Sequence, residues 1–325
     1  MTRKRFLHPT AAACLGILLL ASWPLFWRMD SIHYRVMGMA LFYAALGFSW
    51  NICALTGAIS LGHAAFFGLG AYGSALISHY FHWTPFLTIP VGGILGAVYG
   101  VLWSLFFKKL RGAPFALATL ASVEIPKVII DNWTALTYGS SGIVGIRPLP
   151  AIGPGSFVMG FGEDLKVQYY FLLLFVLAVG AIHLMTFRSR WGWALRAVRE
   201  DEKAASALGI NACRTRLEAI VLSALLTGLC GGLYAHLIGI IEPSLVFDLH
   251  ISALPLVLCI FGGRNQYYGP LLGALVLYPL DQLLFHSLLP AGHAALYGLV
   301  VMLTLIFFPK GLGAWLARTG KPALN

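Results

Sequence analysis

The few charged residues inside the apolar stretches of this chain are the first places to look for chemistry. Glu124 and Lys127 are three residues apart, and Lys127 and Asp131 are four apart. Both spacings put side chains on one face of a helix, where opposite charges can pair. Because an unpaired charge in the middle of a bilayer costs at least about 2.5–3.5 kcal/mol on insertion scales, we expect a pair here. Two interpretations stay open: an internal ion pair near the end of a span, or a polar patch along a path through the membrane.

Two more titratable residues stand alone. His63 lies in the glycine-rich stretch SLGHAAFFGLGAYGSALIS, with Asn51, Thr56 and Ser60 close by. A histidine in this setting is either a proton carrier or, more often, a partner in a hydrogen bond between helices. Asp281 is the lone acid of a later apolar stretch. A membrane enzyme that uses His63 or Asp281 would need a nucleophile–base or metal-ligand spacing around them, and the sequence has none.

Motifs for covalent, metal or nucleotide chemistry are missing from the sequence. It contains no GxxxxGK[ST] loop, no HExxH, no paired-cysteine zinc spacing and no GxSxG turn. We therefore predict no catalytic residues, no metal site and no cofactor, and expect that the chain is not an enzyme. If ATP drives this protein, separate subunits must bind the nucleotide.

The densest group of charges is the short segment 188–216, RSRWGWALRAVREDEKAASALGINACRTR, between two long apolar runs. Its pattern predicts one compact helix, Glu200–Leu208, ended by Gly209 and Asn211. Such a helix is either a surface for another protein or an ordinary solvated loop. In the first case its small apolar face would make the contact, and nearby charges would set the orientation. The predicted contact residues are Arg196, Arg199, Glu200, Asp201, Ala204, Ala205, Leu208 and Gly209.

The composition indicates how these residues are positioned. Hydrophobic residues make up 59% of the chain and charged residues 10%, with a mean hydropathy of +0.81, whereas soluble domains carry about 25% charged residues. The chain is therefore built for a membrane. The net charge of +10 indicates membrane topology rather than nucleic-acid binding, because the Lys and Arg residues gather in loops between apolar runs. We predict one transmembrane domain over residues 1–325.

About ten apolar stretches are long enough to be considered as spans, and about eight remain if two of them are re-entrant. With both termini in the cytoplasm, most Lys and Arg residues fall on the inner side. The Gly- and Pro-rich segment 131–168 then becomes the one long external loop. The predicted spans are Ala11–Trp27, Val36–Ala54, Leu55–Ser78, Phe86–Phe107, Phe115–Ile130, Tyr169–Phe187, Leu217–Ile241, Ile251–Phe261, Pro270–Leu289 and Ala294–Phe308.

Small residues recur every four positions in several of these stretches. Lipid gives helices little hydrophobic reason to associate, so close backbone approach at small residues has to hold them together. The pattern predicts an all-α, polytopic helix bundle with dense packing. The spaced pairs and triplets are Gly92, Gly96 and Gly100, Gly228 and Gly232, Gly269 and Gly273, and Ala64 and Gly68.

Three stretches resemble a known family. RAVREDEKAASALGIN is similar to the cytoplasmic coupling loop of branched-chain amino acid ABC-transporter permeases, specifically the LivM-like subunit. SLGHAAFFGLGAYGSALI (Ser60–Ile77) resembles an early glycine-rich segment of that family, and FFPKGLGAWL (Phe307–Leu316) resembles its closing signature. The likeness runs from about Val36 to Leu312 in the expected order. It implies a permease subunit of an importer in the bacterial inner membrane.

The resemblance also implies cargo and partners. Branched-chain amino acids are the expected cargo, with urea or short amides as related solutes. The expected partners are a paralogous permease subunit, two cytoplasmic ATPase subunits that bind the ATP, an external substrate-binding protein and membrane lipid, with no nucleic acid. The segment 188–216 would then be the contact with the ATPases.

We place the transport path between Leu55–Ser78, Phe115–Ile130 and Pro270–Leu289, because these stretches combine glycines with polar residues. The alternative function is a secondary transporter driven by an ion gradient, which needs ionisable residues at the midplane of the membrane. Uptake that survives ATP depletion but fails without the gradient would favour it. The candidate path residues are Ser60, His63, Phe66, Gly68, Glu124 and Lys127.

Overall fold

The computed structural model describes residue 20 and residues 30–149, 164–263, 266–288, 292–308 and 311–313. Within these ranges the protein is an all-α bundle, as predicted, and seven helices are long and apolar enough to cross a membrane. The predicted first span, Ala11–Trp27, lies outside the described residues apart from Leu20. The seven spans are Ser31–Ala54, Pro85–Phe106, Gly112–Asn132, Leu165–Arg188, Ala212–Ile238, Pro243–Gly262 and Gly269–Leu288.

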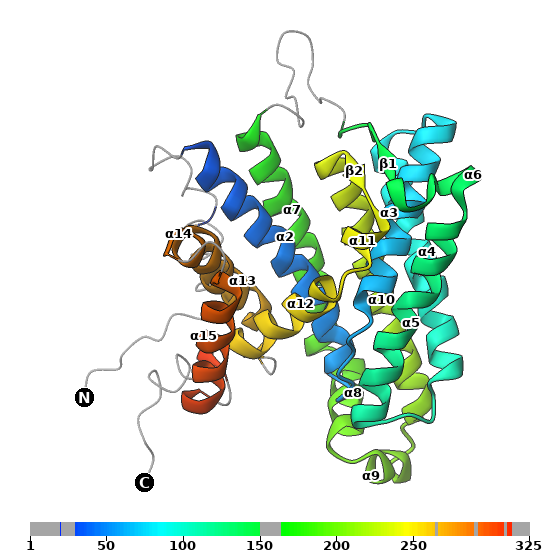
Figure 1. The fold of residues 1–325 in the computed structure, drawn as a ribbon. Coiled ribbons are helices and arrows are strands. Elements are labelled where there is room, and N and C mark those ends of the chain that lie inside the picture. The colour runs from blue at the N-terminus through cyan, green and yellow to red at the C-terminus, as the bar shows by residue number, and fades with distance from the viewer. Residues whose placement is uncertain are drawn as a thin grey trace.

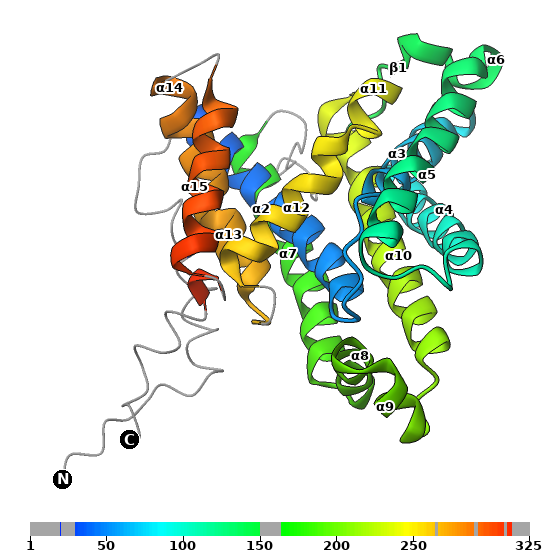
Figure 2. The same cartoon turned by 60° about the horizontal axis from the view of Figure 1, so that its bottom comes forward.

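Helix α2 (Ser31–Ala54) runs through the middle of the bundle (Figures 1 and 2). It is apolar on all sides and almost entirely buried, as expected for a helix surrounded by others. Around one side of α2 pack α7 (Leu165–Arg188), α12 (Leu249–Gly262) and α13 (Gly269–Pro279). On its other side α10 (Ala212–Ile238) joins α2 to a second group of helices.

That second group consists of α3 (His63–Phe81), α4 (Pro85–Phe106) and α5 (Gly112–Asn132). Helices α3, α4 and α10 pack closely against one another, whereas α5 touches the rest mainly through α3. The opposite flank is completed by the π-helical turn η2 (Leu280–Phe285), α14 (His286–Leu288) and α15 (His293–Phe307).

Glycines set the distance between α3, α4 and α10, which confirms the prediction from the four-residue spacing. A Cβ atom built on Gly96 would lie 2.6 Å from the carbonyl oxygen of Ala224, and one on Gly228 would lie 2.6 Å from that of Gly92. Both distances are too short for a real side chain. The backbones therefore approach each other as closely as small residues allow, which is how helices gain contact in lipid.

One predicted span has the wrong start. The sequence predicts Leu55–Ser78, but the helix begins at His63, and residues 55–62 are not helical. Gly57 adopts φ +83° just after α2 and turns the chain back. The indole Nε1 of Trp50 donates to the carbonyl of Ser60 at 2.9 Å, so a buried side chain satisfies part of this irregular backbone. Such backbone is tolerated in a membrane protein where protein surrounds it.

Two later spans are also interrupted. The short stretch Ile251–Phe261 becomes a span only because α11 (Pro243–Val246) precedes α12 in the same direction. The stretch Pro270–Leu289 changes at Pro279 from an α-helix to the π-helical turn η2, because a proline cannot donate the backbone hydrogen bond of a regular helix.

A small structured cap covers one end of the bundle, at the top of Figure 1. It contains α6 (Thr134–Thr137), the 3₁₀ turn η1 (Gly139–Ser141) and β1 (Ile143–Val144), which pairs antiparallel with β2 (Ile240–Ile241). His236 of α10 donates from Nδ1 to the carbonyl of Arg147 at 2.7 Å and so fixes the cap to the helices. Residues 150–163 of the predicted external loop lie outside the described residues.

The close contact between α4 and α10 can be tested with Gly96→Val. The new side chain meets backbone atoms of Ala224, so we expect a loss of about 1–3 kcal/mol through overpacking and a lower thermal unfolding midpoint in detergent. Gly298→Val in α15 is the matched control, because a Cβ atom there meets no atom within 4 Å. Equal midpoints for the two variants would contradict the packing described here.

Candidate functional site

Two short helices project from the end of the bundle opposite the cap (Figures 1 and 2). The hydroxyl of Ser189 accepts from the backbone N–H of Gly192 at 2.9 Å and begins α8 (Arg190–Glu200). The carboxylate of Asp201 accepts from two backbone N–H groups, at 2.8 and 3.0 Å, and begins α9 (Glu202–Ala207). An acid is well suited to this position, because it pairs with the free N–H groups of the first turn.

The predicted single helix Glu200–Leu208 is therefore wrong in its boundaries. Glu200 is the last residue of α8, and Asp201 has extended backbone, with φ −153° and ψ 112°. Asp201 breaks the helix because its side chain caps a new one. The predicted end is close to the observed end: Gly209 adopts φ +84°, and the N–H of Ile210 donates to the carbonyl of Ala205 at 3.1 Å. This is the hydrogen-bond pattern of a glycine-terminated helix.

The predicted apolar contact face also needs a correction. Ala205 is only 2% exposed and belongs to a small core with Val198 and Ala212. It therefore holds α9 against α8 and α10 and cannot belong to an exposed face. Leu208, by contrast, is 82% exposed, and Ala204 is exposed as well.

One carboxylate fixes the position of α9. Glu202 accepts from Nη2 and Nε of Arg111, in the loop between α4 and α5, at 2.8 and 2.9 Å. The same carboxylate accepts from Nη2 of Arg216 in α10 at 2.9 Å. Bidentate pairing to a guanidinium fixes geometry as well as adding free energy. We call this three-residue group the Glu202 clamp, and through it α9 is tied to both α5 and α10.

The two predicted arginines have partners within the chain. The guanidinium of Arg196 lies 4.5 Å from the ring centres of both Phe187 and Trp193, and donates to the carbonyl of Phe187 at 2.9 Å. Partial burial, with a smaller contribution from the charge of Arg199, lowers the pKa of Arg196. Arg199 pairs with Glu200 at 2.6 Å. Arg196 thus fastens α8 to the end of α7.

His63 sits in a closed hydrogen-bond network. The hydroxyl of Ser223 donates to the carbonyl of Ser49 at 2.7 Å, so its oxygen accepts from Nε2–H of His63 at 2.8 Å. The other ring nitrogen, Nδ1, then accepts from the hydroxyl of Ser60 at 2.9 Å. This assignment uses both nitrogens of a neutral imidazole. Of the two interpretations of His63, the geometry favours a hydrogen bond that joins α3 to α10.

The predicted path residues fall into two separate groups. Ser60, His63, Phe66 and Gly68 are all buried. Phe66 packs in a cluster with Cys53, Trp103 and Phe115. Glu124 and Lys127 lie apart from this group on α5, and their charged atoms are 3.6 Å from each other. Among the described residues no ion pair joins Lys127 to Asp131. That any of these residues line a path stays a prediction.

The position of the Glu124–Lys127 pair is unusual for a membrane helix. The Glu124 side chain is 62% exposed. It lies twelve residues after Gly112 and eight before Asn132, about 18 and 12 Å along the helix axis, and so near the middle of the span. Because a carboxylate facing lipid at this depth is costly, this face of α5 must meet water or another protein.

Comparison with known proteins identifies the family of this chain. Residues 32–309 match the family described as "Branched-chain amino acid transport system / permease component". The chain belongs to this family. It is therefore a multi-pass membrane component of a transport system, not an enzyme, and the resemblance seen in the sequence motifs is confirmed.

Individual relatives agree with this assignment. The chain is 31% identical to the LivM permease protein of the high-affinity branched-chain amino acid transport system of Salmonella typhimurium, over 92% of this chain and 73% of the relative. It is 24% identical to the LivH permease protein of the same organism, over 89% and 96%, and 24% identical to the fructose import permease protein FrcC of Rhizobium meliloti, over 84% and 78%. No solved structure matches.

Sequence reasoning missed the Glu202 clamp. Glu202, Arg111 and Arg216 come from three segments, up to 105 residues apart by their numbers, and nothing in the spacing says which charges will pair. The one local signal is the acid–acid pair Asp201–Glu202 at the start of a short helix, where an acid can cap. Among the described residues no group of three or more His, Cys, Asp or Glu side chains is placed to hold a metal ion.

Glu202→Gln tests the clamp. The amide cannot hold both guanidinium groups, so we expect α9 to open more often, by about 1 kcal/mol for a partly exposed pair. Hydrogen exchange of the amides of residues 203–208 should then be faster. Glu218→Gln removes the surface partner of Arg214 instead and should leave exchange in 203–208 unchanged. Unaltered exchange in Glu202→Gln would show that the clamp does not hold α9.

Proposed function

We propose that this chain is the LivM-like permease subunit of an ATP-driven importer of branched-chain amino acids. The complete importer also contains a paralogous permease subunit, two cytoplasmic ATPase subunits that bind the ATP, and an external substrate-binding protein. The protein resides in the bacterial inner membrane with both termini in the cytoplasm. The end of the bundle that carries α8 and α9 is then the cytoplasmic end, which the gathering of Lys and Arg residues there supports.

One observation carries the proposal: a short capped helix that is fixed at its base and exposed at its tip. Ala205 and the Glu202 clamp hold α9 in place, whereas the side chains of Leu208 and Ala204 are exposed on its outer side. An exposed leucine at the end of a fixed helix is suited to fill an apolar pocket in a partner, and full burial of such a side chain contributes about 1.5–3 kcal/mol. The corrected contact face is therefore Ala204, Leu208 and Gly209.

The same contacts explain how motion of an ATPase reaches the spans. A force on α9 passes through Glu202 to Arg111, directly before α5, and to Arg216 in α10. It also passes along α8 to α7 through Arg196. Helices packed through glycine move as a rigid group, so displacement of α9 would rotate the whole set, a hinge or shear motion.

The cargo assignment depends on the relatives. A LivM permease protein is 31% identical, whereas a fructose import permease at 24% shares the family. The fold thus serves more than one solute, and the higher identity favours branched-chain amino acids. The exposed face of α5 around Glu124 and Lys127 is the part of the chain best suited to line the path, because these charges need a polar neighbourhood.

Leu208→Asp is the direct test of coupling. A charge at the tip of α9 opposes burial in an apolar pocket, so we expect at least a tenfold loss of ATPase copurification and of leucine uptake in vesicles, with normal amounts of the permease in the membrane.

Val144→Asp is the control for this experiment, because Val144 is 63% exposed at the opposite end of the molecule. It should leave ATPase copurification unchanged. If Leu208→Asp keeps both ATPase binding and uptake, α9 is not the coupling element. If wild-type uptake survives ATP depletion but needs an ion gradient, the importer itself is the wrong assignment.

A second test concerns the path. Val128 lies one helical turn from Glu124 on the exposed face of α5, so Val128→Cys probes this face while keeping the ion pair. In the assembled importer, with the native cysteines replaced by alanine, we expect a charged maleimide to label it, because thiolates form only in contact with water. Ile94→Cys, on the exposed lipid-facing side of α4, should react at least tenfold more slowly. Equal rates would remove α5 from the path.

A further inference from the structure

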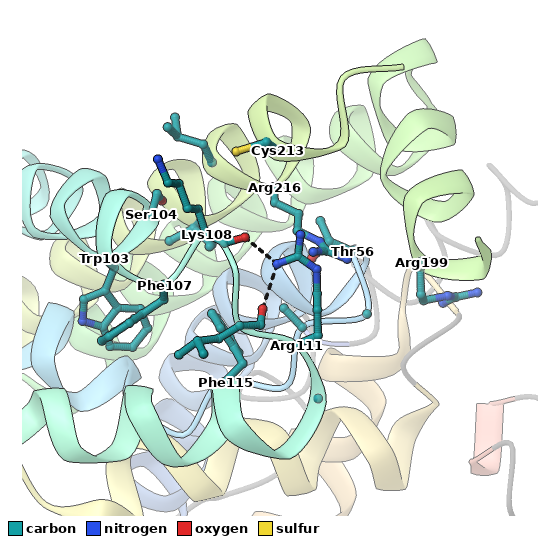
Figure 3. A pocket seen from close by; sticks show the side chains of 16 residues that line it. Thr56, Trp103, Ser104, Phe107, Lys108, Arg111, Phe115, Arg199, Cys213 and Arg216 are labelled. Carbon is teal, nitrogen blue, oxygen red and sulfur yellow. Dashed lines mark hydrogen bonds between the residues drawn. The ribbon is translucent and has the colours of Figure 1, made fainter. Parts of the chain in front are cut away.

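A cavity of about 160 Å³ lies between the start of α10, the end of α4, the loop that leads into α5, and the turn after α2. It is next to the Glu202 clamp, yet the coupling mechanism does not use it. In Figure 3 the side chains of Arg111 and Arg216 lie together in the centre of the view, with Trp103 and Phe107 to one side and Arg199 to the other.

The charged lining of this cavity is entirely basic. Lys108, Arg111, Arg199 and Arg216 line it, and no Asp or Glu does. The guanidinium of Arg111 donates to the carboxylate of Glu202. It also donates to the carbonyls of Lys108 and Leu110, at 2.6 and 2.8 Å. In Arg216, however, Nη1 is buried and has no hydrogen-bond partner among the described residues. A buried guanidinium donor without a partner is costly, and an anion is its natural complement.

The rest of the lining is apolar. Aromatic and aliphatic side chains form one wall, while Thr56 and Ser104 add hydroxyl groups. A volume of about 160 Å³ is roughly half of the smallest pockets that hold drug-sized ligands, so the occupant must be small. The apolar wall consists of Trp103, Phe107, Leu110, Phe115, Leu217 and Ile220.

We propose that this cavity binds a small aliphatic carboxylate from the cytoplasm, with its carboxylate on Nη1 of Arg216 and its hydrocarbon chain against Trp103 and Phe107. The basic lining opposes a ligand that also carries an ammonium group, because like charges at short range repel. A branched aliphatic acid without an ammonium group therefore fits better than the amino acid itself. Inorganic phosphate shares the charge but leaves the apolar wall uncovered.

Binding there has a consequence for the clamp, and this step rests on the proposed function. Arg111 and Arg216 serve both the cavity and Glu202. A carboxylate on Nη1 of Arg216 shares that guanidinium with Glu202 and places a second negative charge beside it, and the repulsion weakens the hold on α9. The cavity would then sense a cytoplasmic aliphatic carboxylate that has the hydrocarbon chain of the cargo without its ammonium group, and reduce further uptake.

Cys213 provides a direct measurement of occupancy. It lines the cavity and is exposed, whereas Cys53, Cys230 and Cys259 are buried. With the purified full-length chain in nanodiscs, the rate of alkylation of Cys213 by N-ethylmaleimide can be followed by mass spectrometry of its peptide. We expect 4-methylpentanoate to slow alkylation at least fivefold at saturation. The probes for comparison are leucine, 4-methylpentanamide, inorganic phosphate, and nanodiscs with and without phosphatidylglycerol.

Three variants separate binding from folding. Arg216→Gln removes the unpartnered donor and should weaken protection by 4-methylpentanoate at least tenfold. Lys108→Gln changes an exposed side chain that lines the cavity and does not touch Glu202, and should weaken protection severalfold without loss of stability. Lys109→Gln, at the next position and outside the lining, should leave protection unchanged.

The outcomes are distinct. Protection by 4-methylpentanoate alone, weakened severalfold in Lys108→Gln but kept in Lys109→Gln, supports the proposal. Equal protection by the neutral amide, by leucine or by phosphate would overturn the assignment of the ligand. Protection that depends only on phosphatidylglycerol would assign the cavity to a lipid headgroup instead. These measurements need no ATPase, so they can still be interpreted if the coupling proposal is wrong.

The regulatory step has its own readout. In the reconstituted importer, 4-methylpentanoate on the cytoplasmic side should lower leucine uptake severalfold in the wild type and in Lys109→Gln, but much less in Lys108→Gln. Inhibition of equal size in all three proteins would show that the carboxylate acts elsewhere.

Discussion

The position of α9 depends on one carboxylate shared by two guanidinium groups. The apolar core that holds α9 is small, because it consists of Val198, Ala205 and Ala212 with two partly buried neighbours. A helix of six residues is far too short to be stable alone. The ion pairs must therefore supply the part of the stabilising free energy that burial of apolar side chains does not. They do so from separate segments, so the same interaction that orders α9 also connects it to α5 and α10.

The bundle beneath the clamp must be stiff for such a connection to carry motion. Close packing of α4 on α10 through Gly96 and Gly228 leaves no room for side chains to rearrange between the two backbones. Helix α5 differs, because it contacts the others mainly through α3 and exposes most of its surface. Under the proposed coupling, motion that enters at Arg111 therefore reaches the least restrained helix of this group.

Sequence reasoning recovered what depends on local pattern. Hydropathy identified the class, an all-α membrane bundle, though the described residues contain seven long apolar helices and not the full set of about ten predicted spans. The glycine spacing gave the contacts of Gly92, Gly96 and Gly228, since it follows from neighbours on one helix. It failed where a side chain competes with the backbone: Asp201 broke the predicted helix by capping a new one. It also failed for pairs distant in the chain. A hydrogen bond between helices was one interpretation of His63, but its partner Ser223 and the pairs of Glu202 could not be inferred, because hydropathy and periodicity contain no information about which helices become neighbours.

The buried contacts of the bundle differ from the ion pair on α5. The glycine contacts bring backbones together without charged groups, and the buried network of His63 satisfies its own polar groups within the chain. The Glu124–Lys127 pair is different, because it remains on an exposed face where lipid is not an acceptable neighbour. If this face lines the path as proposed, a solute that carries both charges, as an amino acid does, can pair with each half of the ion pair in turn. A neutral sugar cannot, so under that proposal the pair gives a difference in cargo a physical basis.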